Sequence, residues 1–178
     1  MKVLLEIYNR LLSRYGPQHW WPGDGPFEMM VGAILTQSVA WINVEKALSN
    51  LKAEELLNPE NLRCAPMHRI SDAIRPAGYY NAKAKKLKAL AAWLDEYCRD
   101  NLADLSRHAT AVLRNELLAV HGIGEETADS ILLYSCDKPA FVVDAYTRRI
   151  VDRLGFNPAD HRYSSYQALF ADNLPPDV

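Results

Sequence analysis

Apolar positions recur at helical spacing along most of this chain, so the pattern predicts an all-α protein. Residues 1–15 read as an amphipathic helix that ends near Gly16-Pro17. Its apolar face is formed by Val3, Leu4, Ile7, Leu11 and Leu12. The same spacing predicts a buried helix over 27–36, a second over about 39–51, short helical pieces over 53–75 broken at Pro59 and Pro66, and a long helix that reaches about residue 99.

The segment 117–156 predicts two helices joined at His121-Gly122-Ile123-Gly124. Apolar positions spaced i, i+3, i+4 mark each helix: Val112, Leu113, Leu117, Leu118 and Val120 in the first, and Ala128, Ile131, Leu132 and Ser135 in the second. Two glycines allow positive φ and close approach of a partner to the backbone. The helix that opens at Glu125 directs free N–H groups into the hinge, where a phosphate could bind. On shape alone, an ordinary helical hairpin with glycine caps is the simpler interpretation.

An acid, Asp144, stands where a third helix begins. Asp is a favoured N-cap residue, so this position has a plain structural explanation. Capping is also compatible with a chemical role, because a cap can hold the carboxylate ionised and aimed. A further amphipathic helix is predicted over 163–174.

Composition limits the classes of function. The 178 residues are 49% hydrophobic, enough for one sizeable core or two small subdomains. No apolar run approaches membrane-spanning length and no signal peptide is evident, so we expect a soluble cytoplasmic protein without membrane contact. A net charge of −2 means that any contact with nucleic acid must be local. Cys64, Cys98 and Cys136 are widely spaced and odd in number, which is typical of reduced thiols.

Two further features have balanced interpretations. A loop dense in Pro and Gly displays Trp20, Trp21 and Pro22, which could either plug a core or contact a ligand. The lysines at 83, 85, 86 and 88 form the densest basic patch, either a solvated helix face or a phosphate contact.

The string Gly122-Ile123-Gly124-Glu125-Glu126-Thr127-Ala128-Asp129, followed by Val142-Val143-Asp144, resembles the endonuclease III superfamily of DNA glycosylases, with its helix-hairpin-helix, Gly/Pro-rich loop and Asp. The resemblance implies two helical lobes flanking a DNA cleft: a middle lobe over 23–134, and a second lobe formed by 1–22 together with 135–178. It implies that the hairpin holds the DNA backbone and that Asp144 is catalytic. Superfamily members normally continue for another helix, so the chain is expected to be C-terminally short.

Within this superfamily, nearly the whole chain is similar to the Helicobacter-type 3-methyladenine DNA glycosylases. The likeness rests on Trp20-Trp21-Pro22, Leu35-Thr36-Gln37, Trp41, the stretch 75–85 and the hairpin. It implies a base pocket at Trp20, Trp21, Pro22 and Trp41, in which Trp20 and Trp41 sandwich the base and Trp41 replaces the family's Phe. Gln37 is expected at the DNA face, where it fills or props the space left by the extruded base. The expected DNA contacts are Gln37, Gly122, Ile123, Gly124, Glu125, Thr127 and Lys83.

The expected chemistry follows from the same positions. An N-alkylated purine is electron-poor and cationic, so an indole face attracts it, and its glycosidic bond is already weakened. Bifunctional relatives attack with a Lys two positions after the second hairpin glycine. Here Glu126 occupies that position, and no Lys lies between Val120 and Asp137. We therefore expect a monofunctional glycosylase in base excision repair that uses water and Asp144, without lyase activity.

No cofactor is expected, since the four-cysteine loop that holds an iron–sulfur cluster in many relatives is not found. The resemblance allows a monovalent cation, Na⁺ or K⁺, at the main-chain carbonyls of Leu118, Val120 and Ile123. The expected partner is damaged double-stranded DNA, bound by a monomer. One alternative is a same-fold glycosylase for mismatched thymine or uracil, which Tyr or Ser near the hairpin would favour and Glu126 does not, or for an oxidised pyrimidine. Another is a non-catalytic DNA-structure-binding module, which would not need Asp144 or the aromatic pair.

Overall fold

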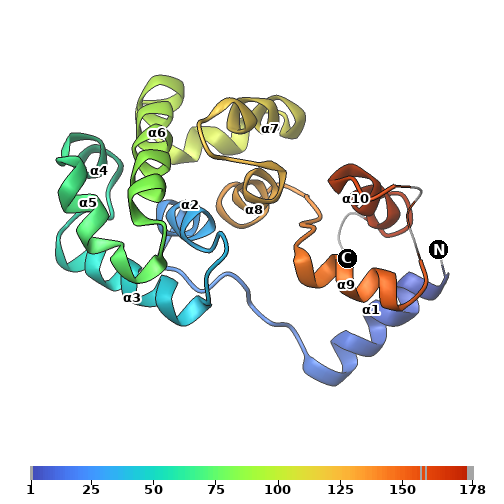
Figure 1. Ribbon diagram of the computed structural model, residues 1–178. Coiled ribbons are helices and arrows are strands. Elements are labelled where there is room, and N and C mark those ends of the chain that lie inside the picture. Colours follow the sequence, from blue (N-terminus) through green and yellow to red (C-terminus); the bar gives the residue numbers. More distant parts are fainter. Residues whose placement is uncertain (1, 157, 159, 176–178) are drawn as a thin grey trace. The chain divides into compact units, whose positions relative to one another are not determined.

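The computed structural model describes residues 2–156, 158 and 160–175. Ten α-helices and two short 3-10 helices account for the regular structure of this part of the chain, which contains no strand (Figure 1). The all-α class predicted from the apolar spacing is therefore confirmed.

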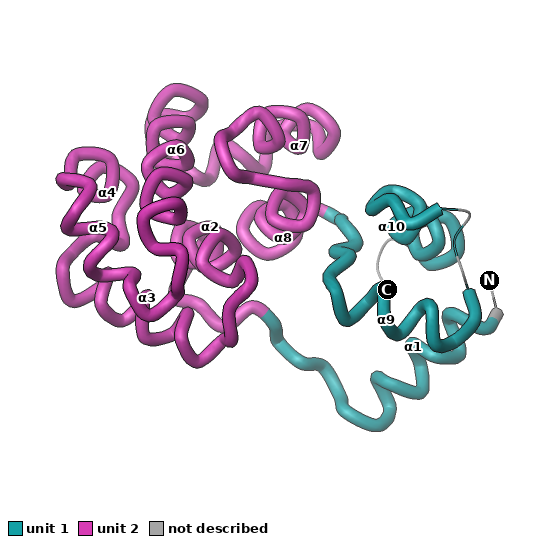
Figure 2. The backbone as a smooth tube through the Cα atoms, in the orientation of Figure 1, with its two compact units in different colours: residues 1–20, 139–178 teal, residues 21–138 magenta. Residues whose placement is uncertain are grey.

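The chain divides into two compact units (Figure 2). Unit 1 combines residues 1–20 with residues 139–178, and unit 2 is the continuous segment 21–138. The sequence had suggested boundaries at 22/23 and 134/135. Each unit is described separately below.

Unit 2 is built around a helix that is apolar on every side. This helix, α2 (Pro26–Leu35), buries Met30, Val31, Ile34 and Leu35 completely and packs mainly on α8 (Glu125–Cys136). The other helices of the unit are α3 (Trp41–Ala53), α4 (Pro59–Cys64), α5 (Met67–Ala73), α6 (Tyr80–Cys98) and α7 (Thr110–Ala119), with 3-10 helices η1 (Arg75–Ala77) and η2 (Leu102–Arg107).

The helix boundaries in unit 2 follow local sequence signals. Pro59 stands in the first turn of α4, whose N-cap Asn58 accepts a hydrogen bond from the Asn61 N–H at 3.1 Å. Pro66 immediately precedes α5. The short helical pieces predicted between 53 and 75 are thus confirmed, whereas η2 was not predicted.

Unit 1 contains α1 (Lys2–Tyr15), α9 (Ala145–Arg153) and α10 (Tyr163–Ala171). Its core is aromatic: Tyr163 and Tyr166 of α10 are buried with Val143 and Val151, and Phe141 and Phe170 pack against them. The helix predicted over 163–174 ends earlier, at Ala171. A core of this kind fixes the segment 141–143, which leads directly into α9.

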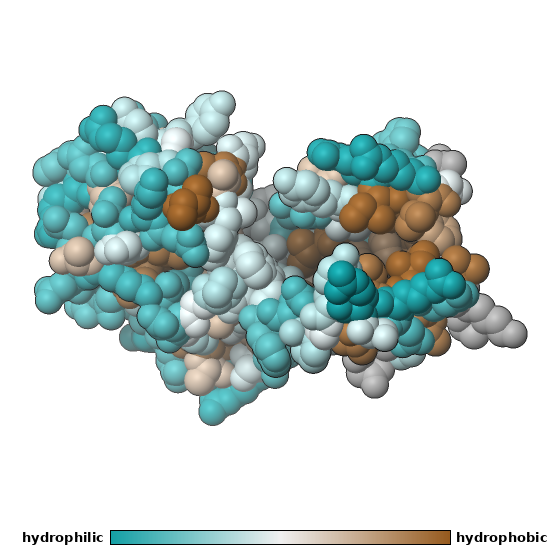
Figure 3. All heavy atoms as spheres, turned by 90° about the horizontal axis from the view of Figure 1, so that it is seen from below, coloured by the Kyte–Doolittle hydropathy of each residue, from teal (hydrophilic) through white to brown (hydrophobic). Residues whose placement is uncertain are grey.

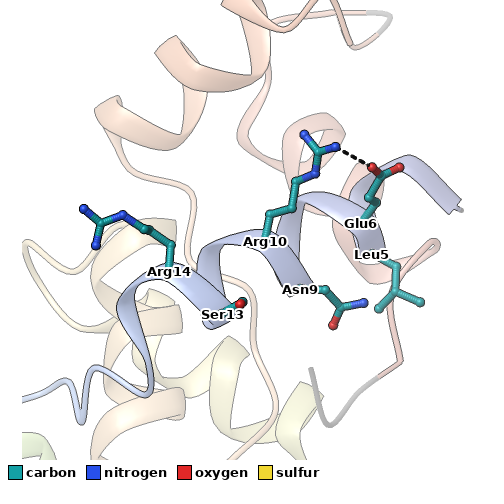
Figure 4. Close-up of a pocket in the computed structure, with 6 residues that line it drawn as sticks. All are labelled: Leu5, Glu6, Asn9, Arg10, Ser13 and Arg14. Atoms are coloured by element: carbon teal, nitrogen blue, oxygen red, sulfur yellow. Dashed lines mark ion pairs between the residues drawn. The ribbon is translucent and has the colours of Figure 1, made fainter.

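Apolar side chains also remain on the surface of unit 1. Val3, Leu11, Leu12 and Tyr15 of α1 are exposed, as are several on α9, and apolar surface gathers on this unit in Figure 3. A hollow of about 600 Å³ runs along α1, and none of the predicted site residues lines it (Figure 4). Arg10 and Glu6 form a 3.0 Å ion pair beside it. Among the described residues, no helix combines the length and apolar character that a membrane span requires.

Candidate functional site

The predicted hinge is a tight turn between α7 and α8. The Val120 N–H donates to the Leu117 carbonyl and the Ile123 N–H to the Val120 carbonyl, both at 3.1 Å. Gly122 has φ +84°, a left-handed conformation that favours glycine, and Gly124 caps α8 with an extended backbone. The two helices therefore meet at the residues that the sequence indicated.

The first turn of α8 is open to solvent. Gly124, Glu125 and Glu126 are exposed, and the N-cap residue, Gly124, has no side chain that could cap the helix. The leading N–H groups of a helix have no intrahelical acceptors, so this end can bind an anion through its backbone. Thr127 differs from its neighbours because its side chain is buried and its hydroxyl is engaged inside the unit.

A buried ion pair fixes the angle between α7 and α8. Asp129 is 1% exposed, and both of its carboxylate oxygens accept from Arg114, at 2.7 Å from Nε and 3.1 Å from NH2. Two parallel bonds define the geometry of the pair as well as its distance. This ion pair therefore holds the two helices of the hairpin rigidly together. The sequence analysis did not identify it.

Gln37 joins the turn after α2 to this hairpin. Its Nε2 donates to the Gly122 carbonyl at 3.2 Å and to the Thr127 hydroxyl at 3.0 Å. Its Oε1 accepts from Lys86 Nζ at 2.5 Å. The sequence placed Gln37 at a DNA face, whereas the structure shows a half-buried side chain whose amide is occupied within the protein at both ends.

Lys83 requires a correction. It was expected to contact DNA, but its side chain is only 2% exposed. Its ammonium donates to the carbonyls of Leu35 and Ala77, both at 2.8 Å, and so joins the end of α2 to η1. Helical phase explains this placement, because Lys83 lies on the same side of α6 as buried Leu87 and Leu90. Lys83 is a support inside unit 2.

Tyr79 is a surface residue that the sequence analysis missed. It follows Gly78, has φ +45° and exposes 76% of its surface. A left-handed conformation is uncommon for a bulky residue and points to constraint by the surrounding structure. The Lys83 N–H donates to the Tyr79 carbonyl at 2.9 Å, and the Lys83 ammonium bonds the carbonyl of Ala77, two residues before Tyr79.

The aromatic residues of unit 2 form one cluster. Trp21 packs on Trp41 edge to face, with centroids 5.4 Å apart at 81°, and on Tyr134 at 5.4 Å. Gly32 makes room for it, since a Cβ there would lie 3.1 Å from Trp21 Cζ2. Trp20, expected to face Trp41 across a base, is the last residue of unit 1 and is 49% exposed; Pro22 is also exposed. Tyr134 was not predicted.

Asp144 is the N-cap of α9, as predicted. Its Oδ1 accepts the Thr147 N–H at 2.7 Å, and the side chain is half-buried. Oδ2 accepts no hydrogen bond from the described residues. The carboxylate is thus oriented by one oxygen while the other is available to a reactant.

Helix α10 holds the segment that precedes Asp144. The Val143 N–H donates to the Tyr163 hydroxyl at 3.1 Å, and Gln167 Nε2 donates to the Phe141 carbonyl at 2.9 Å. The Phe141 ring stacks on Phe170 with centroids 3.9 Å apart. These contacts aim Asp144 through its backbone, and no motif in the sequence indicated them.

No group of three or more His, Cys, Asp or Glu side chains suited to a metal lies in the described parts of the chain. Burial raises the pKa of the Cys136 thiol to about 11, which keeps it protonated. At the hairpin, the Val120 carbonyl already accepts from Ile123 N–H, while Leu118 and Ile123 accept none of the bonds that close the turn. A monovalent cation on these three carbonyls remains a prediction.

The fold, with its hairpin and its capping Asp after a short loop, defines an endonuclease III-like class of protein. The sequence pattern of the HhH-GPD superfamily, described as base excision DNA repair proteins, matches residues 31–176. A relative named putative DNA repair glycosylase MJ1434, from Methanocaldococcus jannaschii, is 44% identical over 99% of this chain and 81% of its own length. Endonuclease III of Sulfolobus acidocaldarius is 30% identical over 81% of this chain, which spans 63% of that protein.

Solved structures agree with these relatives. The crystal structure of H. pylori 3-methyladenine DNA glycosylase (MagIII) bound to 1,N6-ethenoadenine matches with a TM-score of 0.83 at 30% identity, over 96% of this chain and 80% of that one. A non-covalent endonuclease III–DNA complex matches with a TM-score of 0.85 at 21% identity, over 99% and 78%, which supports the fold. The chain therefore belongs to the HhH-GPD superfamily and is a DNA glycosylase of the base excision repair class.

The two hairpin glycines should respond differently to alanine. A Cβ on Gly122 would meet the Lys86 side chain in a left-handed backbone, so Gly122→Ala should lower the free energy of unfolding by about 1–3 kcal/mol. Gly124 has an extended backbone and nothing within 4 Å of an added Cβ, so Gly124→Ala should cost less than about 1 kcal/mol, the loss expected for alanine at an N-cap. Urea unfolding of both variants measures this; equal losses would contradict the assigned role of Gly122.

Lys83 should give the protein a specific pH dependence. Burial, with a smaller effect from Lys86, lowers the pKa of the Lys83 amine to about 8, whereas the unfolded amine has a pKa of about 10.4. Between these values the unfolded chain binds more protons at this residue, so its contribution to stability rises with pH across that window and is flat below it. Urea unfolding at several pH values should show the parent gaining stability there relative to Lys83→Met.

The control for this experiment is Lys85→Met, at an exposed position on the same helix. That variant should follow the parent at every pH. A constant difference between the parent and Lys83→Met from neutral pH to above pH 10 would show that the amine is not perturbed by burial.

Proposed function

We propose that this glycosylase hydrolyses the N-glycosidic bond of an alkylated purine such as 3-methyladenine, flipped out of double-stranded DNA, by Asp144-assisted attack of water. The observation that carries the proposal is the match to the MagIII structure, which extends over 96% of the chain at 30% identity and whose bound ligand is a modified adenine. The site geometry is consistent with this chemistry at three places.

The first place is Asp144. Its Oδ1 is held by the Thr147 N–H, which leaves Oδ2 to face the sugar and the attacking water. As the bond from the sugar to the base nitrogen breaks, positive charge grows on the sugar and a carboxylate stabilises it. The bonding electrons pass to the base, which was cationic through alkylation and so leaves neutral. Water forms the new bond to the sugar carbon and its proton passes to Asp144.

The second place is the hairpin. The exposed first turn of α8 offers backbone N–H groups to a DNA phosphate, which suits a chain with a net charge of −2. Glu126 occupies the position where a lyase would carry its amine, and it is exposed in that same turn. A carboxylate cannot form a Schiff base, so the reaction should stop at the abasic site.

The third place is the aromatic cluster. Trp41 is held edge to face by Trp21, which itself lies against Gly32 and Tyr134. We assign Trp21 to support and the Trp41 face to stacking on the base, because Trp21 is already enclosed by its neighbours. A cationic purine gains more from an indole face than a neutral one does, which would favour alkylated over normal bases.

Asp144→Asn should abolish base release while leaving DNA binding nearly intact. The Asn side-chain oxygen can still cap α9, so the fold should survive, but the anionic charge that stabilises the reacting sugar is lost. Single-turnover excision from methylated duplex DNA and a binding assay on the same duplex measure the two effects. Undiminished excision would remove Asp144 from the mechanism.

In the parent, borohydride should trap no covalent adduct, and a trapped adduct would refute attack by water.

Trp41→Leu should weaken capture of the alkylated base by about 1–3 kcal/mol, as the loss of one stacking face predicts. The matched control is Trp93→Leu, because Trp93 stacks on Tyr97 along α6 and is assigned no role in the base pocket. Excision of methylated and normal purines by both variants gives the comparison. If Trp41→Leu keeps the parent's preference for the methylated base, Trp41 is not the stacking face.

A further inference from the structure

Lys86 is an unexpected contributor to the hairpin. It lies on α6, far from the hairpin in sequence, and its ammonium donates to Gln37 Oε1 at 2.5 Å. This bond determines which end of the Gln37 amide faces Lys86. The amide nitrogen is then the end that faces the Gly122 carbonyl and the Thr127 hydroxyl. Lys86 therefore sets the orientation of the side chain that joins the α2–α3 turn to the hairpin.

The methylene stem of Lys86 contacts the hairpin directly. A Cβ placed on Gly122 would overlap the Cγ, Cδ and Cε atoms of Lys86, so the glycine backbone lies against this stem. Gly122 thus meets two requirements at once: a positive φ and space for a lysine. The hairpin turn therefore packs on the Lys86 stem. Its Gly122 carbonyl also accepts a hydrogen bond from Gln37, the side chain that Lys86 orients.

The charge of Lys86 is not neutralised by a neighbouring carboxylate. Among the described residues it forms no ion pair, and its ammonium bonds the neutral amide of Gln37. Nearby Lys83 adds a second cation, whose own ammonium bonds only carbonyls. The outer side of the hairpin, by contrast, carries Glu125 and Glu126 in the first turn of α8, and Glu125 lies 3.7 Å from Arg114. Carboxylates at this end of the helix repel a phosphate.

We propose that Lys86 is a positioning residue for DNA binding: it fixes Gln37 and the Gly122 turn in the phosphate-binding arrangement, and its half-buried ammonium offsets the two acids at that site. This rests on the proposed function, because it assumes that the hairpin binds the DNA backbone. It assigns Lys86, and neither Lys83 nor Lys85, as the functional residue of the lysine-rich stretch.

The test compares Lys86→Met, Lys86→Arg and Lys85→Met in the full chain, with a fluorescent duplex that contains an abasic-site analogue. Lys86→Met keeps most of the stem but loses the charge and the bond to Gln37, and should weaken binding by about tenfold, as expected for a hydrogen bond to a charged group. The slope of log K against log salt should become shallower by less than one, because the ammonium bonds Gln37 and adds to the local charge without contacting a phosphate itself. The single-turnover excision rate at saturating protein should stay within about threefold of the parent, because Asp144 is unaltered.

Two variants separate positioning from mere stability. Lys86→Arg restores charge and donor, so it should recover affinity and salt slope, and Lys85→Met should match the parent in both.

If Lys86 acts through Gln37, the double variant Lys86→Met with Gln37→Met should lose less affinity than the sum of the single losses. A folded Lys86→Met protein with parental affinity and salt slope overturns the proposal, as do strictly additive losses. Failure of the parent chain to bind the duplex would overturn the proposed function itself. That outcome is seen without any variant, so it is distinct from failure of the Lys86 proposal.

Discussion

The side-chain amide of Gln37 is the contact on which the arrangement of unit 2 depends. An amide has a donor end and an acceptor end, and here the acceptor meets an ammonium while the donor meets a carbonyl and a hydroxyl. Reversing the amide would place like groups together at both ends, so only one orientation satisfies all the partners. That orientation brings the turn after α2, helix α6 and the hairpin together at one edge of the unit, with Arg114 and Asp129 holding the hairpin from behind.

The two units supply different chemistry by the same means. In unit 2 the hairpin offers backbone N–H groups at a helix start, and in unit 1 a helix start orients a carboxylate through the Thr147 N–H. Burial lowers the pKa of Lys83, and this lysine acts as a support inside unit 2. The proposed function therefore depends on exposed ends of helices that buried polar contacts hold rigid.

Much of this could be predicted from the sequence because helix formation is local. Apolar spacing, prolines and caps located the helices, and the Gly-Ile-Gly hinge and Asp144 marked the site through resemblance. Contacts between residues far apart in sequence could not be read in this way: Gln37 with Gly122, Trp21 with Gly32, and Tyr163 with Val143. The error at Lys83 was avoidable, since the helical phase shared with Leu87 and Leu90 predicts burial. The sequence also gave no sign that Gly122 and Gly124 play different roles.

The central claim is the removal of an alkylated purine by hydrolysis. The most direct measurement is to incubate the protein with methylated duplex DNA and to identify the released bases by chromatography, while following the DNA strand by denaturing gel. The account predicts free 3-methyladenine and an intact strand that breaks only after alkali treatment. Release of uracil or thymine from mismatched duplexes with no release of alkylated purine, or strand cleavage that accompanies base release, would contradict it.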